Sequence, residues 1–546
     1  MPAHRYCLTI FLGLAFGLAL AGCESKTSAT PSADAGPDSA AHSAWTKVTP
    51  PKNAVAGGTL TIGLVGGYSS LNFLTVDTND AELDSVLSLV SGGLTREHPG
   101  GKVGPALAES WEFSRDRRLL TFKLRKGVLW SDGKPVTARD VEFTFRASQD
   151  ADIDWRGRRW RAGIVSCEAV GDHTVRFLFR EPYRHQLLDA TFGYVLPSHA
   201  LSSIPFAQWK SREETRAPAG LGPYRVEKWE SDRVTLVPNP HYSEGKPPTL
   251  ERVVLRFYGE AEATWAALQT GEVDFVPRVP PKGVPGLESN LELTKVSRPT
   301  RAYVFLGWNL RDPRLGSREL RDALTRAIDR ERLIRGVYFG DAELIDGPIP
   351  ATCAEAAEVE RVPFSKEEAE SRLEAQAWKL GDDGVRSRGS EVLRFRVVTN
   401  NRPVRRTVFK HLARDLKAVG VELEPVFLDW KSTQAALESG DFDAFIGGWS
   451  VARRTDLRSV WASDGRFNSI GFSMTKIDDA LALLGRLTDP AESEELWREV
   501  QTTIAGEVPY TFLYNPKSVG FMRKSFHGTF DAEAWGYRAS QWTLVK

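Results

Sequence analysis

Residues 121–145 read TFKLRKGVLWSDGKPVTARDVEFTF, and three structural signals follow one another in this stretch. Its first residues alternate polar and apolar side chains, as a strand with one buried face does. Asp132-Gly133 is a two-residue turn signal. Thr137, with Asp140 three positions further on, can cap the start of a helix. The stretch therefore predicts a strand, a tight turn and a capped helix.

The rest of the chain also alternates between strand and helix patterns. Alternating apolar runs predict strands at 57–65, 118–125, 173–179, 233–239, 250–258, 392–398, 421–428 and 442–449. Periodic apolar positions predict helices at 80–94, 260–275, 317–336, 365–378, 404–419, 430–439 and 475–506. Between 390 and 450 the order strand, helix, strand, helix, strand predicts a mainly parallel sheet. We therefore expect an α/β fold.

The bulk composition limits the class of function. A chain of 546 residues exceeds a single hydrophobic core, so two or three domains are expected. Lysine plus arginine and aspartate plus glutamate both number 71, which gives a formal net charge of zero. A nucleic-acid binder would show a basic excess, and we therefore expect no nucleic-acid partner.

The N-terminus predicts export. Arg5 precedes an apolar run that ends in Leu-Ala-Gly-Cys at Cys23, a pattern typical of a secretory signal peptide over residues 1–22. These last four residues resemble the bacterial lipobox, which implies that Cys23 is lipidated; a signal-anchor helix is the alternative. Residues 23–56 have few bulky apolar side chains and predict a flexible tether. We expect a body that is lipid-anchored to a membrane of the cell envelope, on its periplasmic or extracytoplasmic face.

No motif in the sequence indicates catalysis. The chain has no HExxH pair, no GxSxG elbow and no phosphate-binding glycine loop. Cys167 and Cys353 are the cysteines of the mature body, and neither belongs to a CxxC pair. Two buried free thiols are expected, and a disulfide between them stays open. We expect no catalytic residue, no cofactor and no metal site.

Five stretches carry a resemblance to a known family. They are PALAESWEFS (105–114), residues 121–145, LGPYRVEKWE (221–230), LQTGEVDF (268–275) and LRDALTRAIDRERLIRGVYFGDAE (320–343). Together and in this order they resemble the extracytoplasmic solute-binding proteins of ABC importers, family 5, of the oligopeptide, dipeptide and nickel type. Matching blocks run from about residue 58 to about residue 515.

This resemblance implies a two-lobed periplasmic-binding-protein fold with a two-strand hinge and an extra inserted domain. Its implied division of the chain is lobe I at 57–98, 216–306 and 516–546, the inserted domain at 99–215, and lobe II at 307–515. WNLRDP (308–313) resembles the first crossing at the hinge. The opening stretch falls in the inserted domain and is expected to be scaffold, with Trp130 packed in the core.

The resemblance also implies a solute cleft between the lobes, which close by a hinge motion. Three stretches are implied to face this cleft: residues 66–73, 399–406 and 447–461. The candidate solute contacts are Tyr68, Ser70, Asn72, Asn309, Arg402, Trp449, Arg453, Arg454 and Asp456.

Arg402 and Trp449 each have an alternative role. Arg402-Pro403 resembles an Arg-Pro pair that holds a carboxylate in dipeptide-type members, and the fork of an arginine suits two-point contact with a carboxylate. A surface arginine on a basic loop is the alternative. Trp449 resembles the tryptophan that opens the family's cleft loop, and its alternative is burial without solute contact.

The loop after Trp449 departs from the peptide-binding pattern. Peptide-binding members place an amine-holding aspartate three residues after this tryptophan, and here the position is Ala452. Arg453 and Arg454 follow, and they would repel an ammonium group and attract an anion unless they point into solvent. Asp456 is the nearest carboxylate along the chain. An anionic or blocked peptide, or an acidic small molecule, is therefore expected.

The leading hypothesis is a monomeric, non-enzymatic protein that captures a small-molecule or peptide solute and delivers it to an ABC-type permease. A tethered sensor or scaffold on the same fold, which signals to a partner without transport, is the alternative. An enzyme that uses the cleft is a third hypothesis, and no residue of the sequence indicates such an activity.

Overall fold

The computed structural model describes residues 54–76, 82–97, 103–528 and 542–545. The predicted signal peptide, Cys23 and nearly all of the predicted tether lie outside these residues, as does part of the segment 516–546 predicted for lobe I. No helix in the described ranges has both the length and the apolar character that a membrane crossing requires.

Among the described residues, the largest sheet has twelve strands. These are β2 (Thr59–Val65), β9 (Tyr224–Trp229), β10 (Arg233–Pro238), β11 (Arg252–Tyr258), β12 (Phe275–Val276), β13 (Leu293–Pro299), β14 (Ala302–Trp308), β15 (Ala342–Glu343), β19 (Arg394–Asn400), β20 (Glu422–Leu428), β21 (Ala444–Ser450) and β22 (Tyr510–Arg523). Their order is β20-β19-β21-β14-β22-β12-β2-β11-β10-β9, and β13 and β15 also pair with β22.

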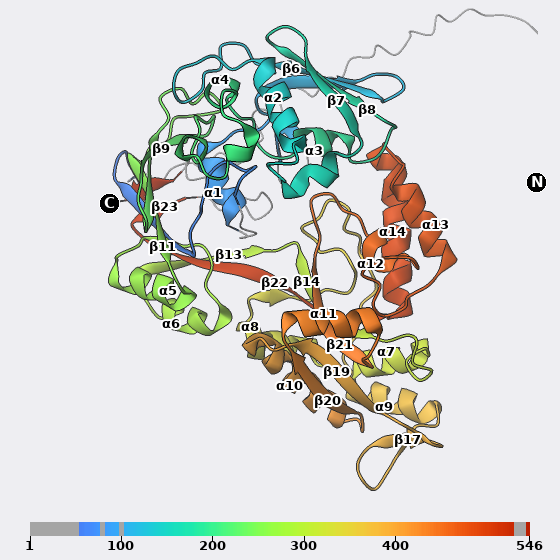
Figure 1. Ribbon diagram of the computed structural model, residues 1–546. Helices are drawn as coiled ribbons and strands as arrows, with labels where there is room; N and C mark the ends of the chain where they lie inside the picture. The colour runs from blue at the N-terminus through green and yellow to red at the C-terminus, as the bar shows by residue number, and fades with distance from the viewer. Residues whose placement is uncertain (1–53, 77–81, 98–102, 529–541, 546) are drawn as a thin grey trace, which may run out of the picture. The chain divides into compact units, whose positions relative to one another are not determined.

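The long strand β22 joins two strand groups within this sheet (Figure 1). Its first residues pair with β14, and its last residues pair with β13 and β12. The first strand group is β2 and β9–β13, and the second strand group is β14 and β19–β21. Because β13 and β14 are consecutive, the chain passes between the groups at two adjacent places, residues 299–302 and 514–517. This arrangement is a two-strand connection of the kind that can act as a hinge.

The first crossing lies earlier in the chain than we expected. β14 pairs with β21 along its whole length, from Ala302 opposite Ser450 to Trp308 opposite Ala444. Residues 302–308 therefore belong to the second strand group, and the crossing expected at 308–313 falls after the strand that has already crossed. An apolar strand such as AYVFLGW carries no local mark of which sheet receives it, so sequence alone misplaced the crossing.

The first strand group contains a parallel pair and an antiparallel meander. β2 pairs in parallel with β11, and β11, β10 and β9 follow one another antiparallel. Helix α1 (Leu83–Val90) contacts β9, and helix α5 (Ala261–Thr270) contacts β2. Leu60 and Ile62 of β2 are fully buried in its core, which is the burial expected from the alternating pattern of this strand.

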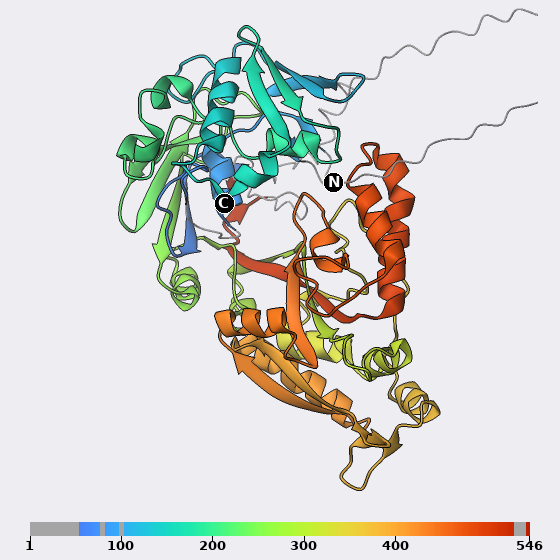
Figure 2. The ribbon, with the colours of Figure 1, turned by 45° about the vertical axis from the view of Figure 1, so that its right-hand side comes forward.

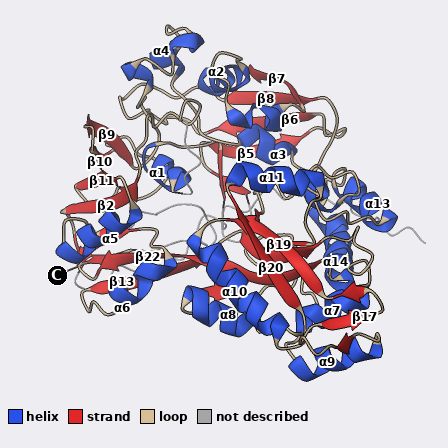
Figure 3. Ribbon diagram, turned by 60° about the horizontal axis from the view of Figure 1, so that its bottom comes forward, coloured by secondary structure: helices blue, strands red, loops and turns tan. Residues whose placement is uncertain are grey.

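The second strand group contains the predicted parallel unit. β19 pairs in parallel with both β20 and β21, which confirms the prediction for residues 390–450. Helix α10 (Pro403–Lys417) connects β19 to β20, and helix α11 (Trp430–Ser439) connects β20 to β21. Figure 3 shows the two helices on opposite faces of these strands, as right-handed connections in opposite directions require.

Two helices that we predicted as continuous are each divided. The segment 317–336 forms α7 (Arg318–Arg326) and α8 (Arg330–Tyr338), and the carboxylate of Asp329 accepts a hydrogen bond from the start of α8. The segment 475–506 forms α13 (Thr475–Leu484) and α14 (Pro490–Glu507), which pack against each other (Figure 2). Asp-Pro at 489–490 begins α14, because proline fits the first turn of a helix and not its interior.

The opening stretch of sequence contributes strand β6 to a separate four-stranded sheet. This sheet has the order β5-β6-β8-β7, with β5 (Ala108–Phe113), β6 (Leu119–Leu124), β7 (Ile164–Ala169) and β8 (Thr174–Phe179). Thr137 and Asp140 form a capping box at the start of α2 (Ala138–Gln149), and Gly133 turns with a φ of +83°. Trp130 is fully buried against this sheet. The predicted strand, turn and capped helix are therefore confirmed.

The remaining elements are short. The strands are β1 (Ala54–Val55), β3 (Thr95–Glu97), β4 (Val103–Pro105), β16 (Lys379–Leu380), β17 (Arg386–Arg388), β18 (Glu391–Val392), β23 (Phe526–His527) and β24 (Thr543–Val545). The α-helices are α3 (Gln186–Thr191), α4 (Ser198–Leu201), α6 (Val284–Glu288), α9 (Lys366–Ala375) and α12 (Arg458–Trp461). The 3₁₀ helices are η3 (Arg156–Arg161), η4 (Phe206–Gln208), η5 (Glu213–Thr215) and η6 (Pro281–Gly283).

Candidate functional site

The carboxyl ends of β19, β20 and β21 meet at one edge of the second strand group. In parallel α/β sheets, ligands bind outside this edge, at the point where the connections change direction. Here α10 leads from β19 to β20 and α11 leads back past β19 to β21, so the change of direction lies between β19 and β21. Arg402 follows β19, Trp430 follows β20, and Trp449 is the second-last residue of β21. The structure therefore brings these three residues to the same edge.

Positive charge gathers at this edge. Arg402 is the N-cap residue of α10, and Arg405 and Arg406 lie in its first turn, which contains no acidic residue. Nη1 of Arg405 donates to the carbonyl oxygen of Gly447 at 3.2 Å, and Nε of Arg406 donates to Oδ1 of Asn401. No carboxylate of the described residues forms an ion pair with these three arginines. Since the start of a helix is itself positive, the edge favours an anion.

Two tryptophans flank this charge. The ring of Trp449 stacks on Phe305 at 6.2 Å between ring centres, and its Nε1 lies 3.4 Å from the hydroxyl of Tyr510. Burial raises the pKa of Tyr510, so its hydroxyl stays protonated. Trp430 is 64% exposed and is the first residue of α11. Sequence reasoning missed Trp430, although its place directly after a predicted strand and the capping Asp429 was a usable signal.

Polar side chains of the loop after β2 form hydrogen bonds within the same loop. Tyr68 is buried and packs edge-to-face on Phe257 at 5.6 Å. The hydroxyl of Ser70 lies 3.0 Å from that of Thr75, and Oδ1 of Asn72 accepts a hydrogen bond from the backbone of the same loop at 3.1 Å. All three predicted residues are thus part of a folded turn. Solute contact by Tyr68, Ser70 and Asn72 stays a prediction.

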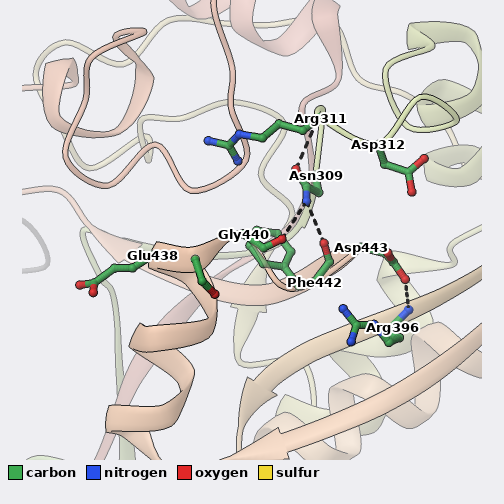
Figure 4. Close-up of a pocket in the computed structure, with 9 residues that line it drawn as sticks. Asn309, Arg311, Asp312, Arg396, Glu438, Gly440, Phe442 and Asp443 are labelled. Carbon is green, nitrogen blue, oxygen red and sulfur yellow. Dashed lines mark hydrogen bonds between the residues drawn. The ribbon is translucent and has the colours of Figure 1, made fainter.

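Asn309 lies at the opposite end of the strands from Trp449. The register pairs Trp308 with Ala444 and Ala302 with Ser450, so the two ends are roughly 20 Å apart along the strands. Nδ2 of Asn309 donates to the carbonyl oxygens of Gly440 at 3.3 Å and Phe442 at 2.8 Å (Figure 4). The structure therefore separates Asn309 from the other residues predicted in lobe II.

Asn309 lines a pocket of about 440 Å³ at the amino-terminal end of β19 and β21. Figure 4 shows its lining, which consists of Asn309, Arg311, Asp312, Arg396, Glu438, Ser439, Gly440, Phe442 and Asp443. Three of its charged side chains have partners: Asp312 pairs with Arg314, Arg396 pairs with Asp441, and Asp443 accepts a hydrogen bond from the backbone of Arg396. Such internal pairing leaves little charge to attract a ligand.

The arginines predicted to attract an anion have carboxylate partners. Nε of Arg453 lies 2.9 Å from Oε2 of Glu97, and Nη2 of Arg454 lies 3.7 Å from Oδ2 of Asp189. Oδ1 of Asp456 accepts a hydrogen bond from the backbone of Arg458 at 3.0 Å. The positive field of Arg453 and Arg454 is therefore offset within the protein. Solute contact by these three residues stays a prediction.

The described ranges contain no group of three His, Cys, Asp or Glu side chains placed to hold a metal ion. Cys167 and Cys353 are both free and buried, as expected from the sequence.

The profile of the bacterial extracellular solute-binding proteins, family 5, matches residues 102–468. The chain belongs to this family. Its predicted membership and its two-lobed α/β fold are confirmed. We call the first strand group lobe I and the second strand group lobe II.

Two relatives illustrate the solutes of this family. The chain is 28% identical to the oligopeptide-binding protein AppA of Bacillus subtilis, over 90% of this chain and 92% of AppA. It is 25% identical to the glutathione-binding protein GsiB of Escherichia coli, over 84% of this chain and 90% of GsiB. The solved structure of AppA in complex with a nonapeptide aligns with a TM-score of 0.65 and 26% identity, over 90% of this chain and 100% of AppA.

Proposed function

We propose that this protein captures a peptide or other polar solute with an anionic group and delivers it to an ABC-type permease. The proposal includes a monomeric protein without enzymatic activity, attached to the envelope through lipidated Cys23. It also includes an inserted domain at about 99–215. The boundary between lobe I and lobe II is proposed near residue 300, whereas it was expected at 306–307 from the sequence.

The observation that carries the solute class is the arginine cluster at the carboxyl edge of lobe II. Arg402, Arg405 and Arg406 have no carboxylate partner among the described residues, in contrast to Arg453 and Arg454. A carboxylate bound there would accept charge-assisted hydrogen bonds from a fork of fixed geometry. We therefore still propose an anion contact, with Arg402 rather than Arg453 and Arg454 as its main residue.

Exposed Trp430 and partly buried Trp449 support a polar solute with an apolar or aromatic part. Trp430 and Trp449 offer rigid faces with a hydrogen-bonding edge, which suits a partly hydrated cleft. The carbonyl oxygens of Val451 and Ala452 accept hydrogen bonds from buried Arg301, at 3.1 and 3.0 Å. Ala452 therefore occupies the position where peptide-binding members have the amine-holding aspartate, and its carbonyl oxygen is bound to Arg301. A free α-amino group is disfavoured there, and a blocked or acidic peptide is favoured.

A binding experiment tests this proposal. Native mass spectrometry of the purified protein would identify a retained solute, and calorimetry would then measure its affinity. Arg402→Ala should weaken binding by about tenfold or more, because a hydrogen bond to a charged group contributes about 1.5–3 kcal/mol. Arg394→Ala is the matched control, since Arg394 lies at the other end of β19 and pairs with Glu422. Its affinity should equal that of the wild type.

Two results would contradict the proposed solute class. One is a retained cationic amine without an acidic group. The other is equal affinity in the Arg402→Ala and Arg394→Ala variants.

A further inference from the structure

Two segments far apart in the sequence meet through polar and charged side chains. Residues 183–189 lead into α3 beside the inserted sheet, and residues 451–456 follow β21 of lobe II. Arg454 approaches Asp189, and Nε2 of His185 lies 3.2 Å from the carbonyl oxygen of residue 455. We call these two segments, with the side chains that join them, the seam.

Arg184 extends the seam to the helices of lobe II. Its Nη1 donates to Oγ of Ser493 at 2.6 Å, and its Nη2 lies 3.3 Å from Oε1 of Glu355. Its guanidinium lies 5.5 Å from the centre of the Trp497 ring. Glu355 also accepts a hydrogen bond from Oγ1 of Thr455 at 2.8 Å. One carboxylate therefore ties both segments of the seam together.

A further contact lies at the end of β3. Glu97 pairs with Arg453, and its side chain is only 13% exposed. The carboxylates of Asp189 and Glu355 are 4% and 12% exposed. If one arginine is removed while the segments stay together, its carboxylate partner is left buried without a cation, which is destabilising.

The charge states fit a docked seam. Burial raises the pKa of Asp189 to about 6, against the opposing effect of Arg454, Tyr183 and Arg161. Burial, together with Arg454 and Arg184, lowers the pKa of His185 to about 3. His185 is therefore neutral beside two arginines, and the ionised form of Asp189 depends on Arg454.

The seam is a second connection between lobe II and the rest of the protein, in addition to the hinge strands. The inserted sheet is covalently joined to lobe I, and lobe I is joined to lobe II by β13–β14 and β22. The seam then joins lobe II to the inserted sheet. Rotation of lobe II about residues 299–302 and 514–517 must therefore separate the seam.

We propose that the seam, together with the Glu97–Arg453 pair, is a latch that holds lobe II against the inserted domain and the adjoining β3, with Arg184, Arg453 and Arg454 as latch residues. These arginines stabilise the docked arrangement of the two segments. This inference goes beyond the proposed function, and its test requires no solute.

A charge swap tests the latch in the full chain. Hydrogen–deuterium exchange of residues 183–191 and 451–461 would be compared among wild type, Glu97→Arg, Arg453→Glu and the double variant. Each single variant should exchange at least threefold faster in both segments, because like charges then face each other. The double variant should return both segments to within twofold of the wild type, since the ion pair is restored with opposite polarity.

Exchange in β6 and β8 is the control for folding and should not change. If a charge reversal disturbs these strands, Arg184→Gln provides the second test, because it removes the contacts to Ser493 and Glu355 without reversing a charge. It should accelerate exchange in residues 183–191 and around α14 together. Unchanged exchange in 183–191 in the single variants, or a double variant as fast as the singles, would overturn the latch.

Discussion

At the scale of single residues, the side-chain amide of Asn309 is used entirely within the protein. Nδ2 donates to two carbonyl oxygens, and Oδ1 accepts a hydrogen bond from the backbone of Arg311 at 3.3 Å. These bonds fix the turn after β14 to the turn before β21. The residue therefore has a structural role that its sequence context did not reveal.

Asn309→Ala should lower the free energy of unfolding by roughly 1–3 kcal/mol, because it leaves buried carbonyl groups without a donor. Urea unfolding followed by circular dichroism would measure this change. Glu438→Gln is the control, since Glu438 lines the same pocket with an exposed side chain. A variant of unchanged stability that loses solute affinity would instead return Asn309 to the binding site.

At the scale of elements, the end of α1 depends on a close approach by the returning chain. A Cβ atom added to Gly220 would lie 1.7 Å from the carbonyl oxygen of Val90, and the backbone N–H of Gly222 donates to the same oxygen at 3.1 Å. Only glycine leaves room for this contact. The Gly-Leu-Gly-Pro sequence at 220–223 is therefore a packing requirement for α1.

Gly220→Ala should destabilise the protein by about 1–3 kcal/mol or more, because the overlap requires a shift of backbone. Gly259→Ala provides the comparison, since no neighbouring atom would lie within 4 Å of its added Cβ. That change should stay within about 0.5 kcal/mol. Thermal unfolding of both variants gives the measurement, and equal melting temperatures would contradict the steric argument.

At the scale of the whole molecule, the two thiols lie in different hydrophobic cores. Cys167 packs in the core of the inserted sheet, and Cys353 packs with Tyr303 and Phe305 of lobe II. Burial raises the pKa of Cys353 to about 11 and raises the pKa of Cys167 as well. Both groups therefore stay in the thiol form at neutral pH.

A full chain with Cys7→Ser and Cys23→Ser should react slowly with a thiol reagent at pH 8 while folded. A raised pKa keeps each thiol protonated up to that pKa, and unfolding restores ordinary reactivity. After denaturation without reductant, two thiols should react per chain. A reduced and denatured sample is the control. Reaction of no thiol until reductant is added would demonstrate a disulfide.

Much of the fold was predictable from local patterns. The capping box at Thr137, the turn at Gly133 and the parallel unit of β19–β21 all follow from spacings of a few residues. The helix breaks at 327–329 and 485–489 were missed because apolar periodicity continued across them. The caps that divide these helices, Asp329 and Asp489, were readable but were outweighed by the periodicity.

The candidate site was predictable in position and less so in its charges. The family resemblance implied that Arg402 and Trp449 face one cleft, and the structure brings both to the carboxyl edge of the parallel unit. Whether an arginine is available to a solute depends on partners that are distant in the chain. Glu97 and Arg453 are an example, and no local pattern links them.

The sequence by itself determined the α/β class, the family and the order of strands and helices, because propensity, capping and strand alternation act over short distances. Only the tertiary structure decided where the chain crosses between lobes, which arginines are already paired, and that Trp430 lies at the same edge as Arg402 while Asn309 lies at the opposite end of the strands. Those properties depend on register and on contacts between segments hundreds of residues apart, and topology alone brings such segments together.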